Sequence, residues 1–354
     1  MKTSTIFIKE RLIKGEGQRV EIYDNIAISS RIRLARNVEG IKFYTKLDSD
    51  VDAKYITGSV MKTLEKFEVF NFLSLKELSL NECNALFEQH LISKELIENK
   101  DISGIAISED EKFIVMINEE DHIREQCIEK GFNLYKPYRR LIKIDEEILS
   151  SLPIAYNDEL GFITASPANL GTGMRASVML FLPACVFSGQ IEDIFAMAKE
   201  NGLTIRGGYG EGSKAIGYFY QISNQNSFGL DENEIIDKVS EFIYSVCNLE
   251  KQARDFLLEN NREFYKDMAL RAYGILTNCY VLEEGEMMEL LAKVKLGQVL
   301  GFLDIENDDK FQKLFFEGAE ANLKLIFEFS QQKKENIIRA EYISNKVKSL
   351  VHRR

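Results

Sequence analysis

Apolar positions alternate with polar ones in short segments of the first two thirds of the chain and recur at helical spacing in the last third. Residues 102–107 and 113–117 predict two strands around a polar turn, and residues 160–165 predict another strand. Helical spacing predicts helices over residues 51–70, 75–99 and 190–199, and residues 132–153 are expected to form helix and loop. From residue 231 onward the pattern is helical, without a convincing strand, and we place a domain boundary near residue 250.

The composition is that of an ordinary globular protein. At 354 residues, 45% of them hydrophobic and 29% charged, the chain is long enough for two domains. The formal net charge of −11 argues against broad nucleic-acid binding, because neutralising phosphates needs a basic face. The longest apolar run, residues 178–187, contains Pro183 and is too short to cross a membrane, and the N-terminus lacks the pattern of a signal peptide. We therefore expect a cytoplasmic protein that does not bind membranes.

Cysteine and histidine usage predicts neither a disulfide framework nor a metal centre. The five cysteines form no CxxC pair, which indicates reduced thiols, and only three histidines are present.

A glycine-rich segment gives the first indication of chemistry. Five glycines between residues 207 and 217 surround Tyr209, Glu211 and Lys214, and Arg206 precedes them. Glycine lets a backbone adopt positive φ and approach a ligand closely, and exposed amides in such loops bind anions. The segment predicts a phosphate site with a carboxylate beside it. Taken alone, it fits a glycine-rich hairpin without a ligand equally well.

Arginines elsewhere in the chain favour the phosphate site. In the strand-like residues 25–36, Arg31 and Arg33 project from one face, because side chains repeat every two residues. Two guanidinium groups on one face repel each other unless an anion lies between them, although a solvated basic edge strand is an alternative. Arg175 stands at the exit of a loop rich in proline and glycine, residues 166–177.

An acidic cluster, residues 118–124, follows a predicted strand. Glu119, Glu120 and Asp121 would repel one another unless they are solvated or face a cation, and Arg124 comes directly after them. The cluster favours a site that holds a cationic substrate, and the acidic first turn of a helix is the alternative.

Arginines converging from separate segments suit a polyphosphate, because guanidinium groups bind phosphate oxygens bidentately and stay charged. The sequence contains no GxxxxGK[ST], HRD or DFG motif, and Ser213 breaks a GxGxxG pattern that begins at Gly208. An ATP site built from arginines remains.

Four motifs in this order resemble the phosphagen (guanidino) kinases, most closely their bacterial protein-arginine kinase branch of the McsB type. The motifs are SSRIRLARN (29–37), NEEDHIR (118–124), SPANLGTGMRASVM (166–179) and RGGYGEGSKAIGYFYQISNQ (206–225). The resemblance implies an α+β fold, with a glutamine-synthetase-like antiparallel β-sheet flanked by helices in a catalytic domain, residues 1–250. An all-α C-terminal domain, residues 251–354, is implied to follow and to serve in dimerisation or substrate docking.

The resemblance also implies a substrate, a cofactor and a site. ATP is expected with Mg²⁺ that the nucleotide carries, so no protein ligand to the metal is predicted. Glu120 and Glu211 are implied to hold the acceptor guanidinium and to assist its deprotonation, which its pKa above about 12 makes necessary. His90, which on spacing alone fits a structural residue, becomes a nucleotide contact. The nucleotide-binding residues implied are Ser29, Ser30, Arg31, Ile32, Arg33, His90, Arg124, Arg175, Ala176, Ser177, Val178, Met179, Arg206, Gly207, Gly208, Tyr209, Gly210 and Glu211.

The acceptor implied is arginine within proteins. Relatives that act on free arginine or creatine carry a helical domain before the SSRIR-type motif, whereas about 28 residues precede it here. By resemblance the product is phosphoarginine. The partners are proteins with exposed arginine, such as a heat-shock repressor and misfolded proteins, with an activator protein and a Clp ATPase in the stress response. A homodimer is expected because the apolar stripes of the tail exceed what one amphipathic layer needs. The alternatives are a kinase of a free guanidino metabolite and a non-catalytic nucleotide-binding adaptor.

Three positions depart from the family pattern. Ser166 stands where relatives usually carry cysteine, and Lys214 stands where they usually carry glutamate. The family's RDxxRA motif, implied to form a regulatory phosphoarginine pocket, corresponds to residues 335–340, where only Arg339 and Ala340 are retained. We therefore predict that activation by phosphoarginine is weak or lost.

Overall fold

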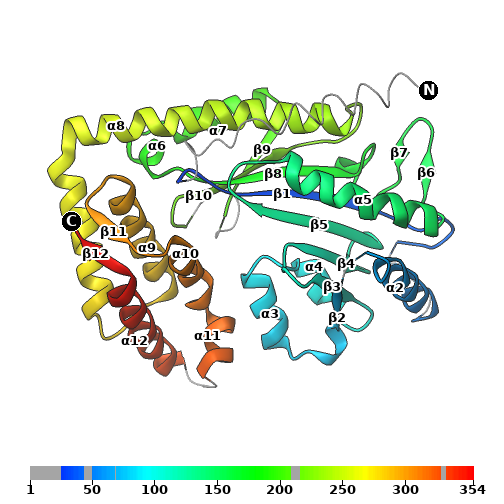
Figure 1. Cartoon of the computed structure of the whole chain (residues 1–354), viewed down its shortest axis with the longest axis horizontal. Coiled ribbons are helices and arrows are strands. Elements are labelled where there is room, and N and C mark those ends of the chain that lie inside the picture. The colour runs from blue at the N-terminus through cyan, green and yellow to red at the C-terminus, as the bar shows by residue number, and fades with distance from the viewer. Residues whose placement is uncertain (1–24, 44–49, 68, 209–215, 328–331) are drawn as a thin grey trace.

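The structure is a computed structural model that describes residues 25–43, 50–67, 69–208, 216–327 and 332–354. A large sheet with helices on both sides forms its N-terminal part, and the C-terminal helices lie against one end of that sheet (Figure 1). Within the described ranges, no helix combines the length and apolar character needed to cross a membrane.

Eight strands form one sheet in the order β2-β3-β4-β5-β1-β8-β10-β9, and each neighbouring pair is antiparallel. The strands are β1 Ala27–Arg36, β2 Phe70–Ser74, β3 Gly104–Ser108, β4 Phe113–Ile117, β5 Ile123–Lys130, β8 Met174–Phe181, β9 Leu203–Gly207 and β10 Phe219–Asn224. The predicted α+β class with an antiparallel sheet is confirmed.

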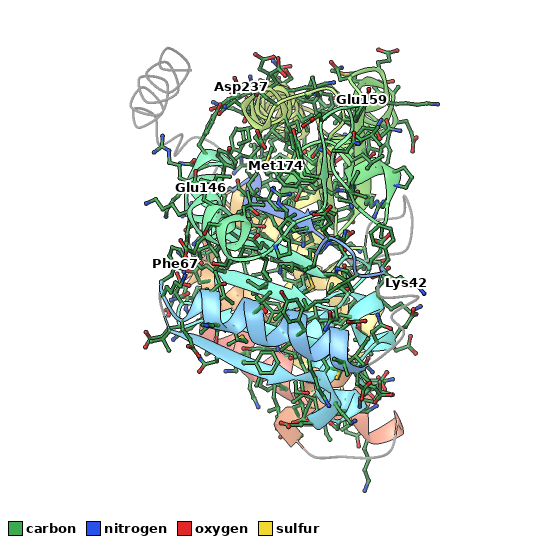
Figure 2. The ribbon with its side chains drawn as sticks, turned by 90° about the vertical axis from the view of Figure 1, so that its right-hand side faces the viewer. Lys42, Phe67, Glu146, Glu159, Met174 and Asp237 are labelled. Carbon is green, nitrogen blue, oxygen red and sulfur yellow. The ribbon has the colours of Figure 1, made fainter. Side chains whose placement is uncertain are left out.

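The central strand β1 shows why the two faces of the sheet differ. Ile32 and Leu34 are buried on one face, whereas Arg31 and Arg33 alternate with them and point to the other. The apolar face packs against α5 (Tyr135–Ser151) and α8 (Glu232–Asn278) in the main core. In side view, α8 with Asp237 lies above the strand that carries Met174, and side chains fill the layer between them (Figure 2).

The other face of the sheet is covered only in part. Helices α3 (Leu80–Glu88) and α4 (Lys94–Glu98) pack on its β2–β4 end over a small second core that includes Cys83, Ile105 and Ile114. The C-terminal helices meet the sheet near β10, where the ring centroids of Phe219 and Phe315 are 5.1 Å apart. The remaining elements are α2 Asp50–Leu64, η3 Leu75–Glu77, β6 Tyr156–Asn157, β7 Gly161–Phe162, η4 Pro167–Asn169, α6 Pro183–Phe187, α7 Ile191–Glu200, α9 Glu284–Val299, α10 Asp308–Glu317, α11 Glu320–Phe327, α12 Gln332–Leu350, β11 Leu303–Ile305 and β12 Val351–Arg353.

Several predicted elements need correction. The helical pattern around residues 51–99 hides the short edge strand β2, and the strand predicted over 160–165 is reduced to β7, which pairs with β6. Residues 118–122 form the hairpin turn between β4 and β5, and Arg124 lies in β5, so the alternative of a helix start does not hold. The helical tail contains a two-stranded ribbon, β11 with β12, where the sequence predicted no strand. Three-residue strands are too short to show an alternating pattern.

Helix α8 continues through residue 250, and its backbone leaves helical geometry at Asn261, with φ −145° and ψ 37°. The domain boundary near residue 250 therefore stays a prediction.

A buried ionic cluster ties the sheet to α5 on the helix-covered face. The Arg36 guanidinium donates to both carboxylate oxygens of Asp145, at 2.9 Å and 2.8 Å, and lies 3.7 Å from the centroid of the Phe162 ring. Glu125 is fully buried beside this pair. Burial and the charge of Asp145 hold the pKa of Glu125 well above the usual glutamate value, and Arg36 only partly opposes them. The neutral form of Glu125 is therefore favoured more strongly in the folded protein than in the unfolded chain.

This shift in the pKa of Glu125 makes stability depend on pH. Because the pKa of Glu125 is higher in the folded state, its contribution is fully present below the unfolded pKa of about 4.5 and decreases as pH rises above it. We expect Glu125→Gln to raise the free energy of unfolding at pH 8 by roughly 1–2 kcal/mol, with little difference near pH 4. Urea unfolding at several pH values measures this, and a difference that does not grow with pH would contradict it.

Candidate active site

Five arginines from four strands reach the open face of the sheet. Arg31 and Arg33 come from β1, Arg124 from β5, Arg175 from β8 and Arg206 from β9. Arg33 pairs across the ladder with Arg175, and Arg31 pairs with Ser177. Paired residues of antiparallel strands share a face, so the register alone places these side chains together.

The arginines repel one another in a poorly hydrated site. Burial, followed by the charges of Arg175 and Arg124, lowers the pKa of Arg31 to about 10. Burial, followed by Arg206 and Arg124, lowers the pKa of Arg175 to about 10. Burial, followed by the charges of the neighbouring arginines, places the pKa of Arg33 well below the usual value. The buried Nε of Arg33 has no acceptor among the residues that the structure describes. Such a donor set fits a polyanion such as the phosphates of ATP.

Two of the arginines are held in place before any ligand binds. The Arg124 guanidinium donates to both oxygens of the buried Glu119 carboxylate, at 2.5 Å for Oε2. Burial alone would lower the pKa of Arg124, but Glu119, Asp121 and Glu120 raise it above the usual value. Arg175 donates from Nε and Nη2 to the Ser223 hydroxyl at 3.2 Å and 2.9 Å. These contacts orient the guanidinium groups in advance.

Glu120 stands at the tip of the acidic hairpin, beside the arginines. Asn118 begins the turn in the left-handed region, with φ 58°, and its backbone N–H donates to the His122 carbonyl at 2.9 Å. The Glu120 carboxylate lies 3.9 Å from Arg124 Nη2, and its side chain is 38% exposed, so an incoming group can reach it. Burial raises the pKa of Glu120, Arg124 opposes this, and Asp121 and Glu119 add to it. A raised pKa makes the carboxylate a better proton acceptor.

Buried polar residues support the hairpin from behind, a role that the sequence did not predict for them. Asp121 Oδ1 accepts from Asn37 Nδ2 and from the backbone N–H of Ala165, both at 2.7 Å, which ties the hairpin to the loop that carries Ser166. His122 Nδ1 accepts from the Val38 N–H at 3.1 Å, so Nε2 carries the proton and donates to a backbone carbonyl. Asn37 is the last residue of the motif SSRIRLARN (29–37), and its place in that motif was the only sign in the sequence that it contributes to the site.

A pocket adjoins the arginines. It is lined by Ser29, Arg31, His90, Ile128, Ser177, Met179, Gly208 and Gln221. His90 follows the end of α3 with φ 60°, a conformation that is uncommon for residues other than glycine, and burial together with Arg31 lowers its pKa to about 4. His90 is therefore neutral at physiological pH. At Gly208 an added Cβ would lie 2.9 Å from Phe219 Cβ and 3.0 Å from Met179 Sδ, so a side chain does not fit there.

The structure brings together only some of the predicted nucleotide contacts. Ser29, Arg31, Ser177, Met179, His90 and Gly208 line the pocket. The side chains of Ile32, Ala176 and Val178 are buried in the main core, and the buried Ser30 hydroxyl donates to the Gly131 carbonyl at 2.8 Å. These four residues hold the strands in place, and their side chains do not line the pocket. Gly207 ends β9. Tyr209, Gly210, Glu211 and Lys214 lie outside the described residues.

Comparisons with known proteins agree with this geometry. Residues 53–253 match the family model described as ATP:guanido phosphotransferase, C-terminal catalytic domain, and residues 262–354 match that of the protein-arginine kinase McsB C-terminal domain. A protein-arginine kinase of Clostridium acetobutylicum is 39% identical over 91% of this chain and 96% of its own length. The chain belongs to the protein-arginine kinase family. The resemblance inferred from the four motifs is thereby confirmed, and the kinase family implies the use of ATP.

Solved structures place this protein-arginine kinase family member among the phosphagen kinases. The duplicated taurocyamine kinase from Schistosoma mansoni, with bound transition state analog components, matches with a TM-score of 0.54 and 28% identity over 65% of this chain and 33% of that chain. Lombricine kinase matches with a TM-score of 0.56 over 64% of this chain and 67% of that chain. Its identity of 24% supports the fold alone.

Proposed function

We propose that this protein transfers the γ-phosphoryl group of ATP to arginine side chains of proteins. The observation that carries the proposal is the arrangement of the open face. Mutually repelling arginines need a polyphosphate between them, and an accessible carboxylate with a raised pKa, that of Glu120, stands at their edge. Phosphoryl transfer needs this combination of charge neutralisation and positioning, and little covalent chemistry from the protein.

In the proposed reaction a guanidino nitrogen of the acceptor forms the N–P bond as the bond between the γ-phosphorus and the bridging oxygen of ADP breaks. Arg31, Arg33, Arg124 and Arg175 bind the phosphate oxygens, and Arg206 extends this set. Glu120 accepts the proton that the guanidinium loses. When bound with the nucleotide, Mg²⁺ neutralises the β- and γ-phosphates. Glu211, the second carboxylate expected here, lies outside the described residues and keeps its role as a proposal.

The choice of a protein acceptor is supported by the relatives called protein-arginine kinases, which this chain matches over most of its length. The competing possibilities are phosphorylation of a free guanidino metabolite and nucleotide binding without catalysis. The test incubates the protein and ATP with an arginine-rich protein, with free arginine, or with both. We expect phosphate on the protein acceptor and none on free arginine. Transfer to free arginine alone would refute the protein acceptor, and no transfer would refute the kinase.

The finer roles are proposals of the same kind. We propose a heat-shock repressor and misfolded proteins as substrates, with an activator protein, a Clp ATPase, a homodimer and a cytoplasmic location.

Regulation by phosphoarginine is expected to be weak or lost, because the buried Arg339 is already engaged. It donates from Nε to the Gly318 carbonyl at 2.7 Å, and it pairs with the carboxylate of Glu335. Adding free phosphoarginine to the acceptor assay tests this, and a several-fold activation would contradict it.

A further inference from the structure

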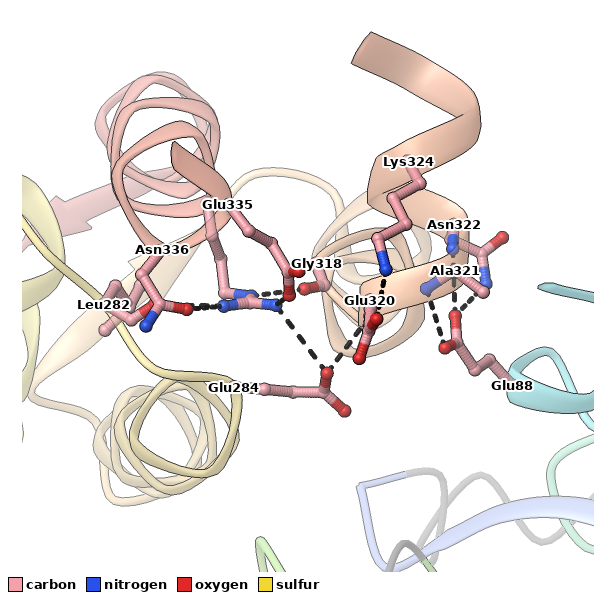
Figure 3. A network of polar contacts seen from close by, with 11 residues as sticks. Glu88, Leu282, Glu284, Gly318, Glu320, Ala321, Asn322, Lys324, Glu335 and Asn336 are labelled. Carbon is pink, nitrogen blue, oxygen red and sulfur yellow. Dashed lines mark hydrogen bonds and ion pairs between the residues drawn. The ribbon is translucent and has the colours of Figure 1, made fainter. Parts of the chain in front are cut away.

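The C-terminal helix α11 begins on carboxylates that belong to other elements. The backbone N–H of Glu320 donates to Glu284 Oε2 at 3.0 Å, that of Ala321 to Glu88 Oε1 at 2.8 Å, and that of Asn322 to Glu88 Oε2 at 2.9 Å (Figure 3). These are amides of the first turn, which have no acceptor within their own helix. Glu88 is the last residue of α3, so a helix of the catalytic sheet caps a helix of the C-terminal part.

The side chain of Asn322 ties the same two helices together. Its Nδ2 donates to Glu88 Oε2 at 2.8 Å and to the Ala85 carbonyl at 3.2 Å, and its Oδ1 accepts from Gln89 Nε2 at 2.5 Å. Charged acceptors make the stronger hydrogen bonds, and a carboxylate at a helix N-terminus is further favoured by the helix dipole. The last turn of α3 is therefore held by α11.

That last turn sets the place of His90. The backbone N–H of His90 donates to the Phe87 carbonyl at 2.8 Å, and that of Leu91 donates to the Leu86 carbonyl at 3.0 Å. These bonds close the C-terminus of α3 with His90 in the left-handed conformation. Glu88 thus lies two residues before a side chain that lines the pocket beside the arginines.

The C-terminal helices also contact the opposite wall of this pocket. Phe315 of α10 packs on Phe219 of β10, next to Gly208. A cleft adjoining the pocket is lined by Glu88 and His90 on one side, by Gly208 of the sheet, and by Glu284 and Phe315 of the C-terminal helices. The C-terminal helices therefore touch both walls, α11 at α3 and α10 at β10.

We propose that Glu88 is a positioning residue for nucleotide binding. By capping α11 it fixes α3, and hence His90, at the separation from Gly208 that the nucleotide requires. The inference rests on the proposed nucleotide site, and it adds that the C-terminal helices set the width of that site through this carboxylate. Glu88 is not expected to touch the nucleotide or the acceptor.

The test measures ATP binding by titration and, separately, kcat at saturating ATP. Glu88→Ala is expected to weaken ATP binding about tenfold and to leave kcat within about twofold of wild type, since binding of the nucleotide weakens equally in the ground state and the transition state. Glu88→Gln, which keeps one carbonyl acceptor, should give an intermediate loss. Asn322→Ala removes the α11 side of the same contact. In combination with Glu88→Ala it should weaken ATP binding little further. Lys324→Gln on α11 is the matched control, because it removes a charge near Glu88 without removing any of the hydrogen bonds to the Glu88 carboxylate.

Unchanged ATP binding in Glu88→Gln and Asn322→Ala, with weakened binding in His90→Ala, would overturn the role of Glu88 and leave the nucleotide site standing. Unchanged binding in His90→Ala would overturn both the role of Glu88 and the place of His90 in the site. Failure of the kinase proposal would give a different result from these binding measurements: the wild-type protein would bind ATP, but no phosphoarginine would form.

Discussion

Replacing Glu120 by glutamine is expected to lower the rate of arginine phosphorylation by about 10²- to 10⁴-fold, the range in which a positioned proton acceptor contributes. Glutamine keeps the size and one carbonyl oxygen but cannot take the proton of a guanidinium group. Because Glu120 lies 3.9 Å from Arg124 at the edge of the arginine set, its loss should leave ATP affinity close to wild type. Steady-state kinetics with a protein acceptor, together with ATP titration, measures both quantities.

Glu95 supplies a matched control for this substitution. It is an exposed carboxylate of α4 whose charge reaches Glu120, so Glu95→Gln changes the local charge equally without removing the proton acceptor. We expect less than a twofold effect there. If Glu120→Gln kept more than about a tenth of the wild-type rate, the assignment of the proton acceptor would be wrong.

Replacing Arg31 by methionine is expected to raise stability and remove activity at once. Without a ligand, Arg31 faces the repulsion of Arg175 and Arg124 in a poorly hydrated site, so its loss should raise the melting temperature by about 2–4 °C. The same change removes a guanidinium that binds phosphate, and kcat/KM should fall at least about a hundredfold. Thermal unfolding with and without ATP, together with kinetics, checks both directions.

Arg36 is the control for Arg31 on the same strand. It points to the opposite face and forms a buried bidentate pair with Asp145, so Arg36→Met leaves a buried carboxylate without its partner. That change should destabilise the protein by roughly 3–5 kcal/mol. If Arg31→Met destabilised the protein in the same way, the picture of a face strained by like charges would be wrong.

The spacing along a strand predicted which side chains share a face, but the sequence predicted the short elements less well. Arg31 and Arg33 could be assigned to one face because a strand repeats every two residues, and that spacing holds in β1. The edge strand β2 could not be separated from the helical pattern on either side, since five residues give too little alternation. Ser30 and Ile32 belong to the predicted motif but face the core, because neighbouring positions of a strand point in opposite directions.

Long-range contacts set the limit of what the sequence alone could give. Glu88 and Asn322 are separated by 234 positions. Neither segment contains a sequence pattern that predicts capping of one helix by a carboxylate at the end of the other. His90 could be assigned to the nucleotide only by resemblance to the family, and the structure adds its place in the pocket. The support of Arg175 by Ser223 likewise depends on the register of β8 and β10, which follows from the folded sheet.

The central claim is that the arginine-lined face transfers phosphate to arginine within a protein. Its most direct test is mass spectrometry of an arginine-rich acceptor protein after incubation with the wild-type protein and MgATP, handled without acid because the N–P bond is acid-labile. The account predicts phosphate on arginine side chains, and none when Glu120→Gln replaces the wild type. Phosphate found only on serine, threonine or histidine, or an equal yield of phosphoarginine from Glu120→Gln, would contradict it.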